Sequence, residues 1–187
     1  SGALTTALAW AVGEKGHIFS YEIRPETQKL ARKNLDRLGL GERVTFKQRD
    51  IVEGFDEHGV DALFLDVQNA FDYLEQARAA LKAGGFFGSI MPTTNQVSRL
   101  LTSLYHSSFA FTEVCEIILR FYKPVPERLR PTDRMVAHTG FLIFSRKMIE
   151  SFHEETPSQP ALSDEVAEGI GFSEEGNTPT DTTPDDE

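Results

Sequence analysis

Strand-like and helix-like segments alternate along the first 150 residues, and this alternation restricts the fold more than any other feature of the chain. Strand patterns occupy Ile18–Tyr21, Val44–Lys47, Val60–Leu65, Phe86–Met91, Phe111–Tyr122 and Val136–Phe144. Helical patterns occupy Ala3–Val12, Pro25–Leu38, Phe71–Leu81 and Gln96–Tyr105. Strands joined by single helices need right-handed crossovers, which give an α/β fold with a mainly parallel sheet. The last two strands have no helix between them, so we expect them to form an antiparallel pair.

The net charge of −10 comes from the C-terminal segment. Residues 151–187 contain 11 acidic side chains and no Lys or Arg, whereas residues 1–150 contain 19 basic and 18 acidic ones. The acidic segment has few apolar residues, so it cannot bury enough surface to offset its chain entropy. We therefore expect one α/β domain at 1–150 and a disordered, solvating tail at 151–187. A second possible role for the tail is to mimic phosphate beside a basic groove.

Cys115 is the single cysteine, which excludes an internal disulfide framework and a multi-cysteine zinc site. Its place in an apolar strand pattern predicts a buried thiol. No apolar run reaches the roughly 20 residues that a membrane span requires, and no signal-peptide pattern opens the chain. The expected compartment is the cytoplasm, with neither a metal nor a membrane as partner.

Acidic residues directly follow two of the expected strands. Glu22 follows Ile18–Tyr21, and Asp66 follows Val60–Leu65, whose apolar pattern predicts a buried central strand. Ligands of open α/β sheets bind outside the carboxyl ends of the strands, so both carboxylates are candidate ligand contacts. Glu22 can accept hydrogen bonds from both hydroxyls of a ribose, as it would in NAD-binding proteins as well. The alternative for each acid is a helix-capping role.

A polar, doubly basic loop precedes the last expected strand. Residues 130–142 read RPTDRMVAHTGFL, and such a loop beside a sheet strand is suited to hold an anionic or planar substrate. Basic side chains gather around this loop: Arg120, Lys123, Arg128, Arg130 and Arg134. They predict contacts with phosphate groups, and the alternative is ordinary solvated surface charge.

The run at 130–142 resembles the "RP-x-x-R-M-V-(G/A)-H-T-G-F-L" end of the tRNA (adenine-N1)-methyltransferase family. LDVQNAF at 65–71 is similar to that family's "L-D-(L/V)-x-x-P-W", and PTTNQV at 92–97 is similar to its "P-x-x-x-Q-V". The resemblance covers nearly all of residues 1–149. It implies a class I, Rossmann-like methyltransferase fold with S-adenosylmethionine as cofactor. It also implies a homotetramer that methylates N1 of adenosine 58 in the T-loop of tRNA.

The resemblance assigns roles to individual residues. Asp66 stands for the family's acid, which faces both the transferred methyl and the target adenine, so it is the expected catalytic residue. Asp50 stands where methyltransferases place an acid on the adenine amine. The expected cofactor contacts are Gly2, Glu22, Asp50, Ile51 and Asp66. The expected substrate contacts are Phe71, Asn95, Gln96, Tyr122, Arg130, Arg134 and His138. Ala70-Phe71 replaces the family's Pro-Trp, which keeps an aromatic ring for stacking in a less rigid loop.

Several of these residues also have simpler interpretations. Asn95 is placed to cap the helix that starts at Gln96, and Asp50 can be a surface turn acid. His138 is expected to hydrogen-bond to the backbone or to a neighbouring carboxylate rather than to act as a base. Adenine N1 already presents a lone pair, so the reaction needs alignment and charge stabilisation more than a strong base.

The first five residues, SGALT, look like the second half of the family's "G-x-G-S-G-A-L-T" turn. In that fold the turn follows the first strand, which lies in the middle of the sheet, and it cradles the methionine part of the cofactor. The family also has a small β-rich domain ahead of that strand. We therefore expect this sequence to be a fragment whose sheet exposes two long edges.

Three other functions stay open on the sequence. A class I methyltransferase for another substrate would share Glu22, Asp50 and Asp66 and differ in the loop at 122–138. A non-catalytic, tRNA-binding subunit would have the same fold with a ruined cofactor site. An NAD-linked oxidoreductase would use Glu22 and not Asp66.

Overall fold

The structure of the chain, a computed structural model, describes residues 2–132 and 140–149. Contacts between Cα atoms divide the chain into Ser1–Phe152 and His153–Glu187, and all described residues belong to the first unit. Its helices are α1 (Ala3–Ala11), α2 (Pro25–Arg37), α3 (Leu74–Ala80) and α4 (Thr94–His106), with 3-10 turns η1 (Gly41–Arg43), η2 (Ile51–Glu53), η3 (Ala70–Tyr73) and η4 (Pro126–Arg128). Its strands are β1 (Ile18–Tyr21), β2 (Val44–Lys47), β3 (Val60–Leu65), β4 (Leu81–Met91), β5 (Phe109–Cys115), β6 (Tyr122–Lys123), β7 (Arg130–Pro131) and β8 (Phe141–Lys147).

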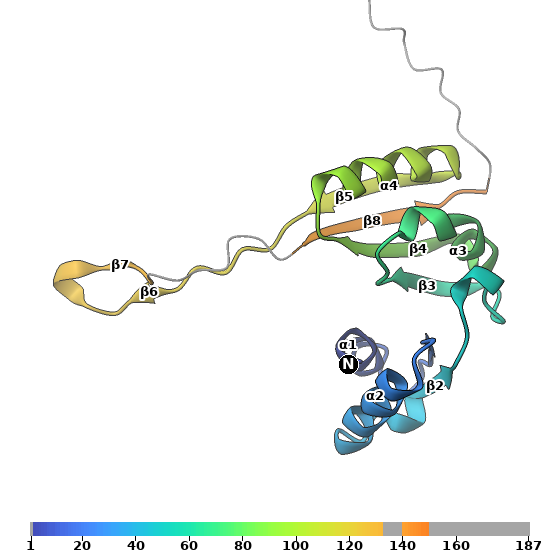
Figure 1. The fold of residues 1–187 in the computed structure, drawn as a ribbon, viewed down its shortest axis with the longest axis horizontal. Helices are drawn as coiled ribbons and strands as arrows, with labels where there is room; N and C mark the ends of the chain where they lie inside the picture. The colour runs from blue at the N-terminus through green and yellow to red at the C-terminus, as the bar shows by residue number, and fades with distance from the viewer. Residues whose placement is uncertain (1, 133–139, 150–187) are drawn as a thin grey trace, which may run out of the picture. The chain divides into compact units, whose positions relative to one another are not determined.

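Four strands form one sheet in the order β3-β4-β8-β5 (Figure 1). β3 and β4 are parallel, while β8 is antiparallel to both β4 and β5. The expected antiparallel end of the sheet is therefore confirmed. The expected buried central position of β3 is wrong for the described strands, because β3 pairs only with β4 and leaves Asp61 and Ala62 exposed.

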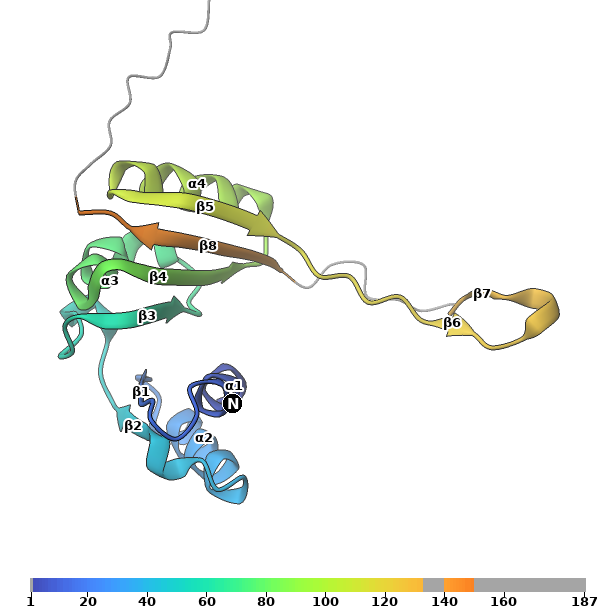
Figure 2. The same ribbon diagram turned by 180° about the vertical axis from the view of Figure 1, so that it is seen from behind.

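The main apolar core lies between this sheet and the helices α3 and α4 (Figure 2). Its largest fully buried side chains include Phe87, Leu100 and Ile143. At the start of α4 the Thr93 hydroxyl accepts a hydrogen bond from the backbone N–H of Gln96 at 3.4 Å. Thr93, rather than Asn95, is therefore the cap of this helix, and Asn95 lies inside the first turn.

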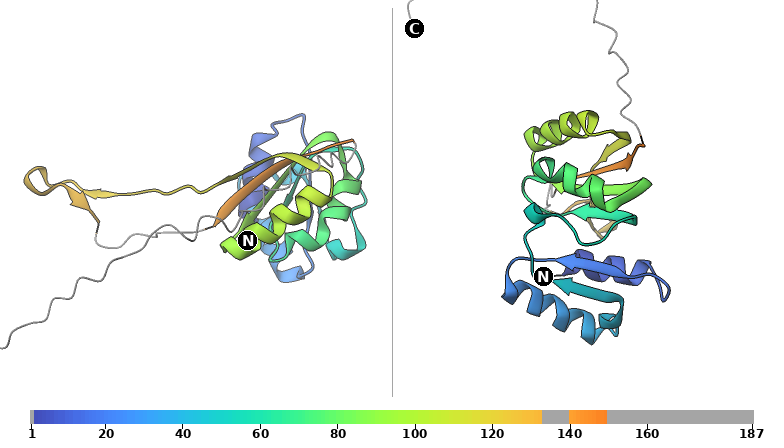
Figure 3. Two further views of the ribbon diagram at one scale, coloured as in Figure 1. Left: turned by 90° about the horizontal axis from the view of Figure 1, so that it is seen from above. Right: turned by 90° about the vertical axis from the view of Figure 1, so that its right-hand side faces the viewer.

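The other parallel strand pair is β1–β2, which packs with α1 and α2 (Figure 3). α2 begins with Pro25 in its first turn, and Gly39, with φ of +68°, follows its end. The buried residues of its core are Ala9, Leu35, Leu40 and Val44. This second core is separate from the first and much smaller.

The strand expected at Phe111–Tyr122 is shorter than the pattern indicated. β5 ends at Cys115, which pairs with Leu142 near the start of β8. Cys115 is exposed, which corrects the expectation of a buried thiol, because most of this edge strand faces solvent. β6 and β7 then form a separate two-stranded antiparallel hairpin. None of the described helices is long and apolar enough to cross a membrane.

Candidate functional site

A cavity of about 730 Å³ lies between β1 and β3. Successive residues of both strands line it, from Ile18 to Glu22 and from Val60 to Val67, so the cavity follows the strand edges rather than one face of the sheet. β1 pairs with β2 and β3 pairs with β4, each on the side away from the cavity. α1 contributes a further wall through Ala3, Leu4, Thr5 and Leu8. Two parallel strand pairs thus border one space along edges that no other described strand pairs with.

The carboxyl ends of β1 and β3 both open into this cavity. Gly2, Glu22, Ile51 and Asp66 all line it, so the structure brings together four of the five expected cofactor contacts. They come from separate parts of the chain: the start of α1, the end of β1, η2 and the end of β3. This convergence is what the rule about the carboxyl ends of strands predicts.

Glu22 is held in place by its own backbone and by Arg24. Its N–H donates to the carbonyl of Lys47 at 3.1 Å, which ties it to the end of β2. Its Oε1 accepts from the Arg24 backbone N–H at 3.0 Å and from Arg24 Nε at 3.3 Å. Burial by itself raises the pKa of Glu22, but these hydrogen bonds lower the pKa below its ordinary value. The side chain is therefore a carboxylate at neutral pH, able to accept hydrogen bonds from a ligand.

Gly2 stands at the N-terminus of α1, with φ of +76°. A Cβ atom at this position would lie 2.6 Å from the Cβ of Ala31 in α2, so no larger residue fits without a shift of the helices. The Thr6 hydroxyl donates to the Gly2 carbonyl at 2.8 Å and closes the first turn. The first backbone N–H groups of α1 have no partner within a helix and carry partial positive charge, which suits an anionic ligand group.

Asp50 is the expected cofactor residue that does not line the cavity. Its carboxylate accepts from the backbone N–H of Val52 at 3.0 Å and so caps η2. The turn that it caps carries Ile51 to the cavity wall. Asp50 therefore stabilises the turn that forms part of the cavity wall, without lining the cavity itself.

Asp66 is exposed at the end of β3, in a loop that is fixed from two sides. The Ser89 hydroxyl donates to the Leu65 carbonyl at 2.8 Å, and the Gln96 side chain donates to the Gln68 carbonyl at 3.1 Å. Asn69, not Asp66, is the N-cap residue of η3, so the helix-capping alternative for Asp66 is excluded. Gln96 thus contacts the loop that carries Asp66, although it does not line the cavity.

Phe71 does not offer an open stacking face. It is 9% exposed and belongs to the main core, and the Arg99 guanidinium lies 4.0 Å from the centroid of its ring. This corrects the expectation that Phe71 stacks on a substrate base. Phe71 belongs to η3, which leads directly into α3, and its apolar side chain is buried in the main core rather than exposed to a ligand.

The expected phosphate contacts lie away from the cavity. Tyr122 is 49% exposed in β6, where Lys123 pairs with Arg130 of β7. Arg128 in η4 and Arg130 are exposed as well. Arg134 and His138 lie outside the described residues, so their expected roles stay predictions.

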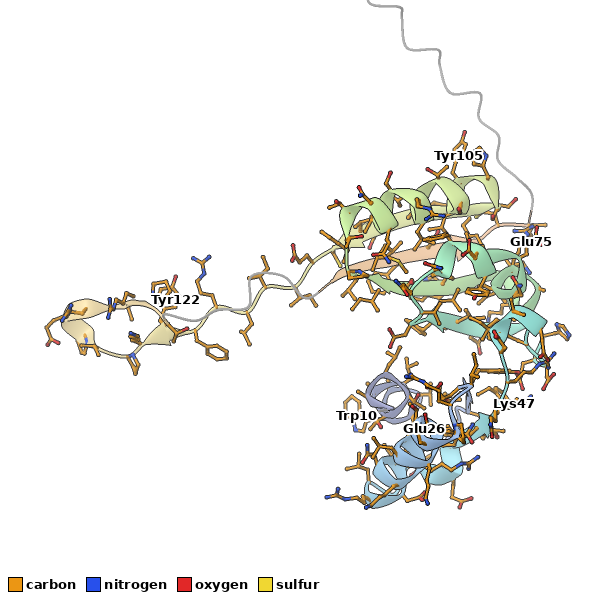
Figure 4. All side chains as sticks on the ribbon, in the orientation of Figure 1. Trp10, Glu26, Lys47, Glu75, Tyr105 and Tyr122 are labelled. Atoms are coloured by element: carbon orange, nitrogen blue, oxygen red, sulfur yellow. The ribbon has the colours of Figure 1, made fainter. Side chains whose placement is uncertain are left out.

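Sequence reasoning missed a polar network next to Glu22 and Asp50. It joins Tyr21 and Lys47 to Asp56 and Glu57, with Lys47 labelled in Figure 4. Arg49 extends the network through Asp56. A signal was present, since basic residues of the segment at 47–49 are followed by acids at 53–57. Only the fold, however, brings Tyr21 to this loop from 36 residues away.

A family described as "tRNA methyltransferase complex GCD14 subunit" matches residues 1–128. The tRNA (adenine(57)-N(1)/adenine(58)-N(1))-methyltransferase TrmI of Methanocaldococcus jannaschii is 34% identical over 172 residues, covering 78% of this chain and 61% of that protein. The tRNA (adenine(58)-N(1))-methyltransferase TrmI of Thermus thermophilus is 33% identical, covering 79% of this chain and 58% of that protein. The chain thus spans about three fifths of the length of these relatives.

Solved structures give the same fold. A SAM-dependent O-methyltransferase from Thermotoga maritima has a TM-score of 0.77 and 55% identity, over 80% of this chain and 57% of that one. The tRNA (m1A58) methyltransferase TrmI from Aquifex aeolicus has a TM-score of 0.72 and 39% identity, over 80% of this chain and 60% of that one. The match over residues 1–128, the identity to these relatives and the shared α/β fold of class I methyltransferases lead to one conclusion: the chain belongs to the family described as the tRNA methyltransferase complex GCD14 subunit.

Proposed function

We propose that this chain is the catalytic part of an S-adenosylmethionine-dependent tRNA methyltransferase that methylates N1 of adenosine 58. The observation that carries the proposal is the convergence of Gly2, Glu22 and Asp66 on one cavity at the carboxyl ends of β1 and β3. Relatives of similar sequence bear the names of tRNA (adenine(58)-N(1))-methyltransferases. The NAD-linked oxidoreductase is not favoured, because these relatives are named as methyltransferases.

The residues around the cavity fit the cofactor. Glu22 provides a carboxylate for the two ribose hydroxyls, and Ile51 provides an apolar wall for the adenine ring. The N-terminus of α1 at Gly2 offers backbone N–H groups to the carboxylate of the methionine part. S-adenosylmethionine would supply an electrophilic methyl group on a sulfonium centre. The described residues include no cluster of His, Cys, Asp and Glu that could hold a metal ion.

Asp66 is the proposed catalytic residue. Adenine N1 presents a lone pair, so the enzyme has to align it with the methyl and stabilise the positive charge that develops on the ring. A carboxylate that accepts from the exocyclic amine does both. Asp66 is exposed at the mouth of the cavity, while its loop is tethered through Leu65 and Gln68, so it can meet a substrate in a fixed position.

tRNA contacts are proposed for the basic residues after β5. The target adenosine must leave its stack to bring N1 to the cavity, which requires a surface that holds the surrounding phosphates. Described candidates are Arg120, Lys123, Arg128 and Arg130, and Tyr122 adds an aromatic ring. Gln96, which donates to the loop that carries Asp66, and its chain neighbour Asn95 are proposed to border the base pocket.

A different methyl-accepting atom is the main alternative within this proposal. The structure from Thermotoga maritima is titled an O-methyltransferase, which names oxygen rather than adenine N1 as acceptor. A class I methyltransferase for another substrate is therefore the second candidate. A non-catalytic tRNA-binding subunit is less favoured, because Glu22, Asp50 and Asp66 are all present.

Assembly into a homo-oligomer, a tetramer by family resemblance, and a cytoplasmic location complete the proposal. Large apolar side chains are exposed after β5: Ile117, Ile118, Leu119, Phe121, Val125 and Leu129. A monomer rarely leaves so many of them in one short segment without a partner surface. Further copies of the chain are the proposed partner, which a mass measurement in solution tests directly.

The space between β1 and β3 is proposed to receive one further parallel strand, the one that the SGALT turn implies. Such a strand would pair with both open edges and lead into α1 at Gly2. The strand would also fill much of the cavity and leave open the part at the carboxyl ends of β1 and β3, where Glu22 and Asp66 lie. The proposed domain is therefore the methyltransferase domain at 1–150 completed by that strand, with 151–187 as an appended tail.

The decisive experiment is methyl transfer from labelled S-adenosylmethionine to a tRNA transcript, by protein with the strand joined ahead of Gly2. The product nucleoside is then identified after digestion. We expect 1-methyladenosine, and its loss from a transcript with guanosine at position 58. Methyl label on a ribose or on a non-RNA acceptor would favour the second candidate, and no transfer with retained tRNA binding would favour a non-catalytic subunit.

A further inference from the structure

The loop between β2 and β3 is fastened to the sheet by one tyrosine hydroxyl. Tyr21 donates to Oε2 of Glu57 at 2.6 Å, and accepts from the backbone N–H of Asp56 at 2.8 Å. Its ring meets Phe55 edge-on, with centroids 5.0 Å apart and planes at 86°. Three successive loop residues therefore contact a single side chain at the end of β1.

Two cations at the end of β2 complete the attachment. Lys47 donates to Asp56 at 2.7 Å and to Glu57. Arg49 pairs with Asp56 and donates to the Glu53 carbonyl at 2.9 Å. These contacts favour the ionised acids, so Lys47 lowers the pKa of Asp56, and it lowers the pKa of Glu57 against the opposing effect of burial. Both acids of the network are therefore ionised at neutral pH.

The fastened loop is also a wall of the cavity. Ile51, Phe55 and Glu57 line the cavity, and Asp50 caps the turn η2 that starts at Ile51. Apolar packing holds this segment only in part, because Val52 is 59% exposed and Asp56 is exposed as well. Hydrogen bonds to Tyr21, next to Glu22 in the chain, therefore fix the distance between the loop and the ribose-binding carboxylate.

We propose that Tyr21 is a positioning residue, which holds the loop at 50–57 against β1 so that Ile51, in the turn that Asp50 caps, meets the adenine ring of the bound cofactor. The inference rests on the proposed cofactor site. Tyr21 acts through the loop, and contact between its hydroxyl and the ligand is no part of the role. Its removal should loosen the adenine end of the site and leave the reacting end, at Asp66, unaffected.

The test uses the protein with the strand joined ahead of Gly2, and compares wild type, Tyr21→Phe, Glu57→Gln and the control Tyr105→Phe, which removes the same hydroxyl from α4. S-adenosylhomocysteine and adenosine are the probes, measured by calorimetry, with amide hydrogen exchange on the same proteins. Tyr21→Phe should weaken both ligands by the same factor, about tenfold, the contribution of a hydrogen bond to a charged group. Exchange should accelerate at 51–57 and stay unchanged in α4, and Glu57→Gln should act in the same direction more weakly.

A double variant separates positioning from general stability. If Tyr21 acts through the turn that Asp50 caps, then Tyr21→Phe should cost little more affinity once Asp50→Ala has already loosened that turn, whereas independent effects would multiply. Turnover at saturating cofactor should be that of wild type. Faster loop exchange with unchanged affinity would overturn the inference and leave the proposed function standing. Failure of wild type to bind either probe would instead remove the cofactor site itself, and the inference with it.

Discussion

The two parallel strand pairs of this molecule are stabilised in different ways. β3 and β4 belong to a sheet that buries a core of 15 described residues under α3 and α4. β1 and β2 share a core of four, and most of the ion pairs among the described residues, from Glu22–Arg24 to Arg49–Asp56, lie in this part. Apolar packing does not depend on the ionisation of side chains, whereas the polar network is weakened both by protonation of its acids and by screening with salt.

The difference matches the chemistry proposed for each part. Asp66, which must keep its position relative to the reacting atoms, follows a strand of the larger core. Glu22, which has to admit and release a ligand, follows a strand of the smaller one. The comparison predicts that changes in the first part affect rate or global stability, and that changes in the second affect affinity.

Asp66→Ala gives the largest expected effect. Loss of the carboxylate should lower the methylation rate by about a thousandfold, the upper range for removing one preorganised electrostatic contact. The affinity for S-adenosylhomocysteine should stay within about twofold, since other residues hold the ligand. Single-turnover kinetics and calorimetry measure the two quantities, with Asp72→Ala as a control on the neighbouring η3. Near wild-type turnover would refute the assignment.

Leu100→Ala and Leu35→Ala test the two cores with the same deletion, because both side chains are fully buried. Leu100 lies in the large core, and its truncation should cost about 3 to 4 kcal/mol of unfolding free energy. Leu35 lies in the small core, where the surroundings can relax, so its loss should be nearer about 2 kcal/mol. Urea unfolding gives both values, and equal losses would contradict the comparison.

Glu22→Ala should weaken S-adenosylhomocysteine binding by about tenfold or more, because each lost hydrogen bond to a charged group contributes about 1.5–3 kcal/mol. Turnover at saturating cofactor should change little. Glu26→Ala, an exposed acid in the first turn of α2, is the matched control. Calorimetry with unchanged affinity in the Glu22 variant would remove this residue from the site.

Acid should release the loop at 50–57 before it unfolds the large core. The pKa values of Asp56 and Glu57 are lowered in the folded chain, so the stability that they contribute is present at neutral pH. It is lost as the pH falls from the ordinary pKa values of these acids, about 3.9 for Asp and about 4.3 for Glu, through their lowered values in the folded chain. The protection factors of the amides at 51–57, which correct for the intrinsic pH dependence of exchange, should therefore fall below about pH 4 before those in α4 do. A simultaneous fall in both segments would show that the two parts do not differ in this respect.

Arg130→Ala gives the smallest expected effect. A lost phosphate contact should reduce the steepness of the salt dependence of tRNA binding by about one ion, with only a few-fold change in affinity. Arg37→Ala, in the last turn of α2, is the control. Parallel binding lines for wild type and the Arg130 variant across a salt series would mean that this side chain is surface charge only.

The periodicity of the sequence predicted elements well where neighbouring segments of the chain pack locally. β1, β2 and β3 have the expected bounds because their apolar runs end at polar residues or glycine. The cap of α4 is Thr93 and not Asn95. Both residue types cap helices well, so the sequence alone does not decide between them, and the backbone conformation does. The helix expected at Phe71–Leu81 became η3 and α3, and Leu81 joined β4, through pairing with Val60 that no local pattern encodes.

The site was predictable to the extent that it follows from strand ends. The positions of Glu22 and Asp66 at strand ends could be predicted from the order of strands and helices alone, and both residues line the cavity. Phe71 was assigned to a ligand because it stands where the resembled family has Trp, but an aromatic ring at that position can pack in the core as well as stack on a base, and here it packs against Arg99. The contact between Tyr21 and Glu57 depends on long-range geometry, so a single sequence did not reveal it.

The close approach of Gly2 to Ala31 should couple the substitutions that these two positions accept during evolution. With 2.6 Å between the Cβ of Ala31 and a Cβ built on Gly2, the two sites share room for one methyl group. A lineage that enlarges position 31 must spread α1 from α2, and the end of the cavity opens with them. Among relatives, substitutions at one of these positions should therefore be accompanied by changes at the other, and variation at both should be rarer than at exposed positions of the same helices.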